Sequence, residues 1–396
     1  MSRPRRGDLA YHWSLDPKIT FLNHGSFGAT PIAVMDEQSR LRSLMERDPV
    51  RFFERDFLGL MGSARESLAD FLNADPDGLA FVKNATEGVN TILRSLILED
   101  GDEIIVPNHS YQACWNAVDF VTERSGAKTV VVDIPFRVES ESEIVDLIMA
   151  AVSEKTVLAL IDTVTSPTGL RMPFEELVEG LQKSGVDVLL DAAHGPGIVP
   201  LNLKELGAAY CTGNCHKWIC TPKGSAFLHI RNDRKSGVRP LSIGHGASLQ
   251  GSDQEKFEYE FGWPGTQDPT PWLCIPKALE YIGGLVEGGW PSIMEKNRDL
   301  VLEGRRVICD ALGTDPPVPD SMVSSIAAVE MPGNGEVGPM SFEGDPFHNS
   351  LLDDYGIQVP VFPWMHHGTR YIRVSAQLYN HLDEYTFLAE ALKECL

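Results

Sequence analysis

Two short segments carry the residues whose chemistry is easiest to interpret. The first, 186–194, reads VDVLLDAAH and ends an apolar, β-branched run with the carboxylate of Asp191. Such a run is typical of a buried parallel strand, and open α/β sheets bind ligands where these strands end. The second, 212–218, reads TGNCHKW and presents Lys217 after a turn of small residues. A lysine for a Schiff base and an aspartate that keeps a pyridine nitrogen protonated predict pyridoxal 5'-phosphate as the cofactor.

Each of the two residues has a simpler interpretation when it is taken alone. An aspartate at a strand end most often caps a helix, and a lone lysine is usually a solvated charge. The joint context favours the chemical interpretation, because the lysine segment continues through the turn TPKG at 221–224 into a strand-like run at 225–230.

The whole of 212–230 resembles the cofactor-lysine segment of the class V aminotransferases, a family of fold-type-I pyridoxal phosphate enzymes that includes the cysteine desulfurases. Within the family, the chain is most similar to the branch of the isopenicillin N epimerases and the ergothioneine-pathway C–S lyases. Further matching segments are FLNHGSFG at 21–28, NATEGVN at 84–90, WPGTQD at 263–268 and RYIRVS at 370–375.

Strands and helices that would position these residues alternate along the chain. Strands are expected at 79–82, 103–106, 128–134, 157–161, 186–190, 208–211 and 226–230, and helices at 33–46, 57–72, 87–98, 114–124, 142–152 and 174–184. This βαβ rhythm predicts an α/β fold with a mostly parallel seven-stranded sheet covered by helices on both faces. The last strand follows a tight turn, and the resemblance implies that it runs antiparallel.

The rest of the chain suggests the domain organisation. We expect an N-terminal segment, 1–20, that packs with a small domain, a large cofactor-binding domain, 21–270, and a connecting helix followed by a smaller C-terminal α/β domain, 271–396. The Gly- and aromatic-rich stretch 241–268 favours a long functional loop, 271–284 a connecting helix, and 332–346 a surface loop.

Composition limits the class of protein. The chain has 396 residues, of which 43% are hydrophobic, and its formal net charge is −22. That charge disfavours a nucleic-acid partner, because phosphate binding needs positive charge. The basic start is not followed by the apolar stretch of a signal peptide, and no run approaches the roughly 18 apolar residues of a membrane span. We expect a cytoplasmic protein with no membrane partner.

The seven cysteines are an odd number without a secretory signal, which predicts reduced thiols. Cys211, Cys215 and Cys220 with His216 do not have the paired spacing of a zinc site. We therefore expect no metal, and we expect these three cysteines to act as small buried hydrophobes.

The cofactor phosphate is expected at a helix start. The segment 84–88 lies between a predicted strand and a predicted helix, where free N–H groups can hold a dianion. Thr86 could also be a plain helix cap, but the family pattern favours phosphate binding by Ala85, Thr86 and Glu87. The resemblance also assigns Asn214 and His216 to the phosphate. It lets Thr266 reach the phosphate of a neighbouring subunit, which implies a homodimer.

The resemblance assigns the ring contacts as well. Tyr111 occupies the place of the residue that stacks on the pyridine ring, and His194 and Ser166 would approach the phenolic oxygen. Ser166 departs from the asparagine common in cysteine desulfurases, which favours the epimerase branch.

The substrate is expected to be an amino acid. Arg373 lies in a strand-like apolar run and matches the family's carboxylate anchor, and a guanidinium can hold a carboxylate through two parallel hydrogen bonds. A surface ion pair is the alternative role. Asn23, His24 and Gly25 are expected to bind the substrate, and the walls of its pocket are expected to come from 23–28, Trp263 and Trp364.

We expect Lys217, Asp191 and Tyr111 to be catalytic. The amine of Lys217, released by an incoming amino acid, takes the Cα proton while Asp191 holds the ring protonated. The later steps remain open at this stage. Reprotonation on the opposite face gives epimerisation, expulsion of sulfur at Cβ gives a C–S lyase, and attack by a cysteine gives a desulfurase.

No cysteine occurs in 361–368, which disfavours a desulfurase. The candidates for a second proton donor are Tyr111, His24, His366 and His367. We expect an isopenicillin N epimerase-like enzyme, with a cysteine-conjugate C–S lyase as the alternative. An aminotransferase, a desulfurase or a non-catalytic relative of the fold is less expected.

Overall fold

The computed structural model describes residues 3–332, 345–364 and 370–396 of the chain. The expected surface loop at 332–346 lies almost entirely outside the described residues, as do His366 and His367.

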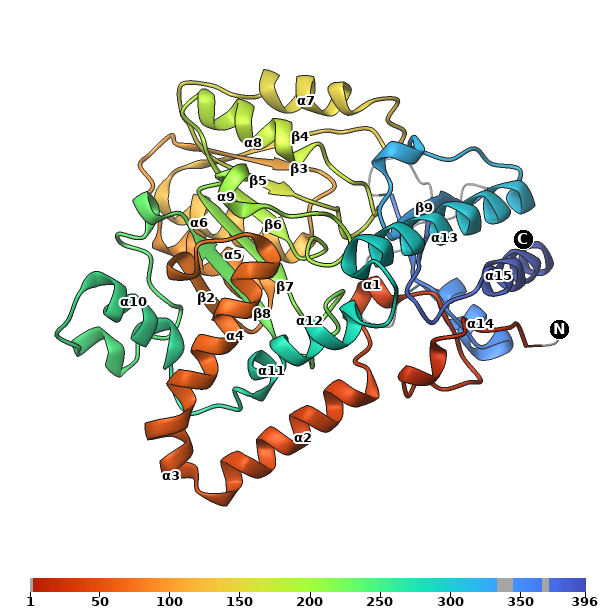
Figure 1. The fold of residues 1–396 in the computed structure, drawn as a ribbon. Helices are drawn as coiled ribbons and strands as arrows, with labels where there is room; N and C mark the ends of the chain where they lie inside the picture. Colours follow the sequence, from red (N-terminus) through yellow and green to blue (C-terminus); the bar gives the residue numbers. More distant parts are fainter. Residues whose placement is uncertain (1–2, 333–344, 365–369) are drawn as a thin grey trace.

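A seven-stranded sheet forms the centre of the molecule (Figure 1). Its strands are β2 (Leu79–Val82), β3 (Glu103–Pro107), β4 (Lys128–Val132), β5 (Thr156–Asp162), β6 (Asp187–Ala192), β7 (Tyr210–Asn214) and β8 (Ala226–Ile230). They lie in the order β2-β8-β7-β6-β5-β3-β4. Strand β8 is antiparallel to both neighbours and the other pairs are parallel, which confirms the predicted sheet.

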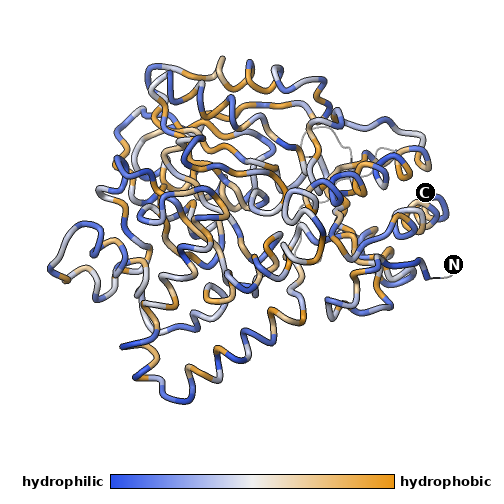
Figure 2. Tube along the Cα trace, in the orientation of Figure 1, coloured by the Kyte–Doolittle hydropathy of each residue, from blue (hydrophilic) through white to orange (hydrophobic). Residues whose placement is uncertain are grey.

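The central strands are apolar on both sides because helices cover both faces. In β5, Leu158 and Leu160 pack in one core cluster with residues of α5 (Ala85–Ser95) and α6 (Gln112–Ser125). Ala159 and Ile161 pack in another with α4 (Phe57–Leu72), α7 (Glu141–Ala150) and α8 (Phe174–Lys183). Successive side chains of a strand point to opposite faces, so the continuous apolar run follows from this layering. In Figure 2 the hydrophobic colour accordingly follows the strands in the middle of the molecule.

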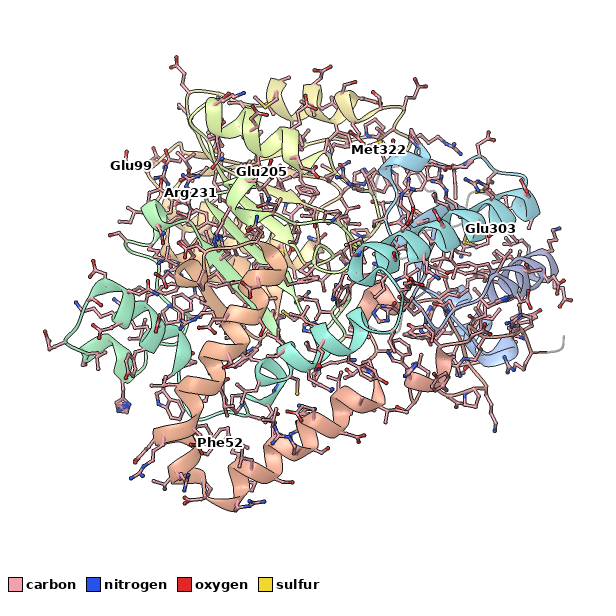
Figure 3. All side chains as sticks on the ribbon, viewed as in Figure 1. Phe52, Glu99, Glu205, Arg231, Glu303 and Met322 are labelled. Carbon is pink, nitrogen blue, oxygen red and sulfur yellow. The ribbon has the colours of Figure 1, made fainter. Side chains whose placement is uncertain are left out.

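The N-terminal helices form an arm that extends from the body at the bottom of Figure 1. It consists of α2 (Ile32–Arg47), α3 (Pro49–Arg51) and α4, with a π-helical turn between the last two. Phe52, labelled in Figure 3, lies in this turn and is buried.

The C-terminal part contains a smaller antiparallel sheet. Its strands are β9 (Ile326–Glu330), β11 (Val361–Pro363) and β12 (Arg370–Ser375), with β12 in the middle. Helices α13 (Gly289–Leu312) and α15 (Leu382–Cys395) share its core cluster. A two-stranded parallel pair, β1 (Thr20–Phe21) with β10 (Ile357–Gln358), attaches the start of the chain to this part.

The structure corrects two expectations about 241–284. The stretch 241–268 is not only a loop, because α10 (Asp253–Gly262) forms within it. Ser252 and Glu255 cap this helix reciprocally, and the sequence contains that pair. The expected connecting helix is divided at Cys274 into α11 (Thr270–Leu273) and α12 (Ile275–Gly283).

The remaining helices are α1 (His24–Phe27), α9 (Leu203–Leu206) and α14 (Pro346–Tyr355). Among the described residues, no helix combines the length and the apolar character needed to span a bilayer.

Candidate active site

A cavity of about 710 Å³ opens at the carboxyl ends of β5, β6 and β7 and is closed on its other side by β11 and β12. This volume lies within the range of ligand and cofactor sites. Ten of the residues proposed from sequence line it: Ala85, Thr86, Tyr111, Ser166, Asp191, His194, Asn214, His216, Lys217 and Arg373.

Lys217 follows β7 and extends into this cavity, with its amine 2.9 Å from Nε2 of His194. Burial lowers the pKa of Lys217 to about 7, and the positive charge of Arg373 adds to the effect, while Asp191 and Cys114 oppose it. A substantial fraction of the lysine is therefore a neutral amine at neutral pH, which is the form that can attack a carbonyl or accept a proton.

The backbone at Gly28 packs closely against the backbone of His216 and Lys217. Gly28 has a φ of 68°, and a Cβ there would lie 2.2 Å from the carbonyl oxygen of His216 and 2.9 Å from Cα of Lys217. Only glycine permits this approach.

Asp191 lies near the end of β6 and its carboxylate faces the cavity. It accepts hydrogen bonds from the N–H of Ala193 at 2.9 Å and from the thiol of Cys114 at 3.3 Å. Burial raises the pKa of Asp191, whereas these two donors and Lys217 lower it. The thiol of Cys114 therefore has a polar role, whereas Cys211, Cys215 and Cys220 are buried, as expected for small hydrophobes.

A second buried carboxylate, Asp162, was missed from the sequence. It ends β5 and is the direct neighbour of Asp191 across the sheet. Ser110 donates a hydrogen bond to it at 2.7 Å, and both residues line the cavity. Burial and the adjacent Asp191 raise the pKa of Asp162 well above its usual value. An available signal was that Asp162 ends an apolar run, as Asp191 does.

The start of α5 forms a cradle of N–H groups. Asn84 accepts from the N–H of Glu87 at 2.8 Å, and Asn214 accepts from that of Ala85 at 2.9 Å. Between them, the N–H of Thr86 has no protein acceptor among the described residues. The free N–H at a helix start, beside a threonine hydroxyl, is suited to an anion.

His216 lies on the cavity wall and donates from Nδ1 to the carbonyl of Ser225 at 2.8 Å. Burial lowers the pKa of His216 to about 4, so its ring is neutral as the structure stands. An anion in the cavity would raise that pKa, because it stabilises the charged imidazole.

Arg373, in β12, is a buried cation without an acidic partner. Its guanidinium donates to the carbonyl oxygen of Ser166, to the hydroxyl of Ser26 at 2.8 Å and to the side-chain oxygen of Asn23 at 3.3 Å. No carboxylate of the described residues pairs with it. Burial lowers its pKa to about 10, so the group stays charged at neutral pH. A buried unpaired charge is costly, and a ligand carboxylate would complete the site.

Five of the residues that were assigned a substrate- or cofactor-binding role from the sequence do not line the cavity. Asn23, His24 and Gly25 form a layer behind it, and the cavity contacts of α1 come instead from Ser26 and Phe27. His24 is fully buried and binds the hydroxyl of Tyr379 and the carbonyl of Lys217.

The other two are Glu87 and Thr266. The Glu87 side chain turns back to accept from the N–H of Lys83 at 2.7 Å. Thr266 is exposed and lies apart from the cavity of its own chain.

Aromatic side chains form the wall opposite the sheet. Phe362, Trp364 and Tyr371 come from β11, the residue after it and β12. Tyr111, at the start of α6, is 45% exposed at the cavity surface. Phe362 and Tyr371 were not identified from sequence, because the strand pairing that gathers them is a tertiary feature. Trp263, expected as a wall, packs instead on Phe53 and Phe57.

Comparison with known proteins identifies the family and the fold of the chain. The family model described as "Aminotransferase class-V" matches residues 32–304. The chain is 31% identical to isopenicillin N epimerase of Amycolatopsis lactamdurans, over 96% of each chain. It is 30% identical to a probable chloroplastic L-cysteine desulfhydrase of Arabidopsis thaliana, over 95% of this chain and 83% of the relative. A cysteine desulfurase structure from Thermococcus onnurineus matches with a TM-score of 0.78 at 18% identity, over 100% of this chain and 99% of that one. The expected fold type is confirmed.

Proposed function

This chain belongs to the class-V aminotransferase family, its cofactor is pyridoxal 5'-phosphate, and we propose that it removes the Cα proton of an amino-acid substrate. One observation carries the proposal. Lys217, a buried amine with a pKa lowered to about 7, and Arg373, a buried guanidinium with no acidic partner among the described residues, share a single cavity.

The cavity residues fit the cofactor. We propose that the phosphate is held by the start of α5 at Ala85 and Thr86, with Asn214 and His216 beside it. Asp191 would accept a hydrogen bond from the protonated ring nitrogen, and Lys217 would be the point of covalent attachment. Tyr111 would cover the ring, with His194 and Ser166 near its phenolic oxygen. When bound, the cofactor supplies an aldehyde that condenses with amines and a ring that withdraws electrons from Cα.

Three residues of the chain would then have separate roles in the reaction. Arg373 would hold the substrate carboxylate through two hydrogen bonds and thereby orient the Cα–H bond. The amine of Lys217 would accept the proton, because burial keeps it largely uncharged before the step. Asp191 would keep its negative charge next to the ring nitrogen, and its bonds from Ala193 and Cys114 stabilise that charge.

We propose epimerisation as the outcome. The likeness to isopenicillin N epimerase extends over nearly the whole of both chains and supports this choice. Inversion needs a second proton donor on the face opposite Lys217. The full burial of His24 and its hydrogen bond to the carbonyl of Lys217 disfavour it as this donor. Among the described residues, Tyr111 remains the candidate from sequence that reaches the cavity.

A C–S lyase is the second candidate. The likeness to an L-cysteine desulfhydrase supports it, and β-elimination requires only one base at Cα. No cysteine is among the described residues lining the cavity, so a thiol nucleophile is not part of either proposal.

One incubation separates the two outcomes. The holoenzyme is supplied with L-amino acids and with S-substituted cysteines in deuterated buffer, and the Lys217→Ala variant serves as control. Both proposals predict deuterium at Cα of accepted amino acids. Epimerisation scrambles the stereocentre and retains the carbon skeleton, whereas elimination yields pyruvate and ammonia. Pyruvate without inversion would reject the epimerase, and absence of Cα exchange with every substrate would reject both.

We also propose a homodimer with a shared active site. Thr266 is exposed and lies apart from the cavity of its own chain, as expected for a residue that serves a partner's site. Sedimentation of the holoenzyme should give twice the chain mass, and Thr266→Ala should weaken cofactor retention. A monomeric holoenzyme would contradict this assembly.

A further inference from the structure

His194 lies between two nitrogen atoms with very different properties. Its Nε2 atom is 2.9 Å from the amine of Lys217, and its Nδ1 atom accepts a hydrogen bond from the indole N–H of Trp218 at 3.2 Å. All three side chains are buried. Trp218 follows Lys217 directly in the sequence, yet nothing in the proposed chemistry has used it.

An indole nitrogen can only donate. The Nδ1 atom of His194 must therefore be unprotonated, and a neutral imidazole then has its proton on Nε2. We propose that Trp218 is a positioning residue that fixes His194 in the Nε2–H tautomer, so that His194 donates toward the reactive nitrogen of Lys217. The lysine amine can accept this bond only when it has a free lone pair.

The same contact disfavours a charged His194. An imidazolium would place an N–H on Nδ1 facing the indole N–H, and two donors cannot share that short distance. Burial lowers the pKa of His194 well below its usual value, and the positive charges of Lys217 and Arg373 act in the same direction. Lys217 in turn faces Arg373, Asp191 and Cys114.

The indole is held in place on several sides. Gly197 has a φ of 92°, and a Cβ there would lie 3.1 Å from the backbone carbon and Cβ of Trp218. The ring of His24 lies 4.8 Å from the indole, centroid to centroid. Because Trp218 is 1% exposed, its N–H cannot exchange His194 for water without movement of these neighbours.

His24 is arranged in the same way at the other end of the lysine. Its Nε2 must donate to the carbonyl of Lys217 at 3.0 Å, so its Nδ1 accepts from the hydroxyl of Tyr379 at 2.8 Å. Two neutral histidines thus contact Lys217. His24, fixed by Tyr379, donates to the backbone carbonyl, and His194, fixed by Trp218, donates to the amine.

The tautomer assignment follows from geometry alone, whereas its value for catalysis rests on the proposed function. Nitrogen-15 NMR of the full chain with labelled histidine rings tests the assignment without turnover. Spectra are recorded on the holoenzyme and again after the cofactor is removed, and His194→Gln identifies the signals. The proposal predicts a pyridine-type Nδ1 and a pyrrole-type Nε2 for His194 in both forms. A pyrrole-type Nδ1, or a doubly protonated ring at neutral pH, would overturn it.

Trp218→Phe tests the cause, because it keeps the ring and removes the N–H. The His194 signals should then move toward a mixture of the two neutral tautomers. The matched control is Trp290→Phe, which removes an indole bond to Leu279 at 3.1 Å on α12 and α13. It should leave the His194 signals unchanged. Identical His194 signals in Trp218→Phe and the wild type would reject the role of Trp218.

Discussion

The two sides of the cavity differ in how the protein stabilises the buried charge on each of them. On the sheet side, the buried charge of Asp191 is stabilised by donors of the protein itself, Ala193 and Cys114. On the β12 side, the acceptors that the described residues offer to the charge of Arg373 are all neutral. A protein charge that serves a permanently bound group can be stabilised by fixed donors of the protein. A protein charge that serves an exchanging ligand is instead neutralised by the opposite charge of that ligand. We infer that the sheet side is organised for the cofactor and the β12 side for the substrate.

Asp191→Ala should have the largest effect on the sheet side. Loss of the carboxylate removes the charge that keeps the ring nitrogen protonated, and turnover should fall about a thousandfold while some cofactor remains bound. The matched control is Asp187→Ala, since Asp187 begins the same strand but pairs with Arg234 at 2.7 Å. Turnover close to wild type in Asp191→Ala would mean that another group holds the ring nitrogen.

Arg373→Lys tests the β12 side. The lysine retains the charge but not the planar fork, so KM for the amino acid should rise about 10- to 100-fold while the cofactor absorbance is preserved. Arg370→Lys, on the same strand, alters an ion pair with Asp345 and serves as the control. If Arg373→Lys left KM unchanged and instead released the cofactor, the division between the two sides would be wrong.

The smallest effect is expected for His109, which contacts Trp364 of the cavity wall. His109 donates from Nε2 to the carbonyl of Ile134 at 3.1 Å, and its ring lies 4.6 Å from that of Trp364. Burial lowers the pKa of His109 from 6.5 to about 4. The unfolded chain therefore binds a proton below pH 6.5 that the folded chain does not bind until about pH 4, and stability falls over that window.

At pH 5 this single group should weaken the fold by about 2 kcal/mol. Urea unfolding of wild type and His109→Gln at pH 7 and pH 5 measures the effect. The loss of stability between the two values should be smaller by that amount in the variant, and the exposed His245→Gln should not differ from wild type. An equal loss in His109→Gln would show that this ring does not contribute to acid sensitivity.

The sequence was sufficient to locate the strands of the sheet, because each is a short apolar run bounded by helices or turns, and the family resemblance implied the antiparallel direction of β8. It was less informative for α10. This helix is mostly polar and has little apolar periodicity, and its capping pair, Ser252 and Glu255, is the signal that indicates a helix. Lys217, Asp191 and Arg373 were found because they lie in distinctive segments. Asp162 was missed because its meeting with Asp191 depends on the register of two strands far apart in the chain.

The substrate side was harder to predict for a similar reason. The pattern at 21–28 led to Asn23, His24 and Gly25 as substrate-binding residues, whereas the turn of α1 presents Ser26 and Phe27, from the expected wall segment 23–28, to the cavity. The missing acidic partner of Arg373 is visible only when its surroundings are folded. Spacing along the chain therefore located the segments of the site, and packing decided which side chains face the ligand.

The position of the cofactor attachment tests the central claim most directly. The holoenzyme is reduced with borohydride, digested and analysed by mass spectrometry. Lys223 is the natural comparison, since it lies in the following turn and its amine donates to the carbonyl of Gly28 at 3.0 Å, outside the cavity. We predict a single reduced cofactor adduct on Lys217 in the wild type and in Lys223→Ala, and none in Lys217→Ala. An adduct on Lys223 or on any other lysine of the wild type would contradict the account.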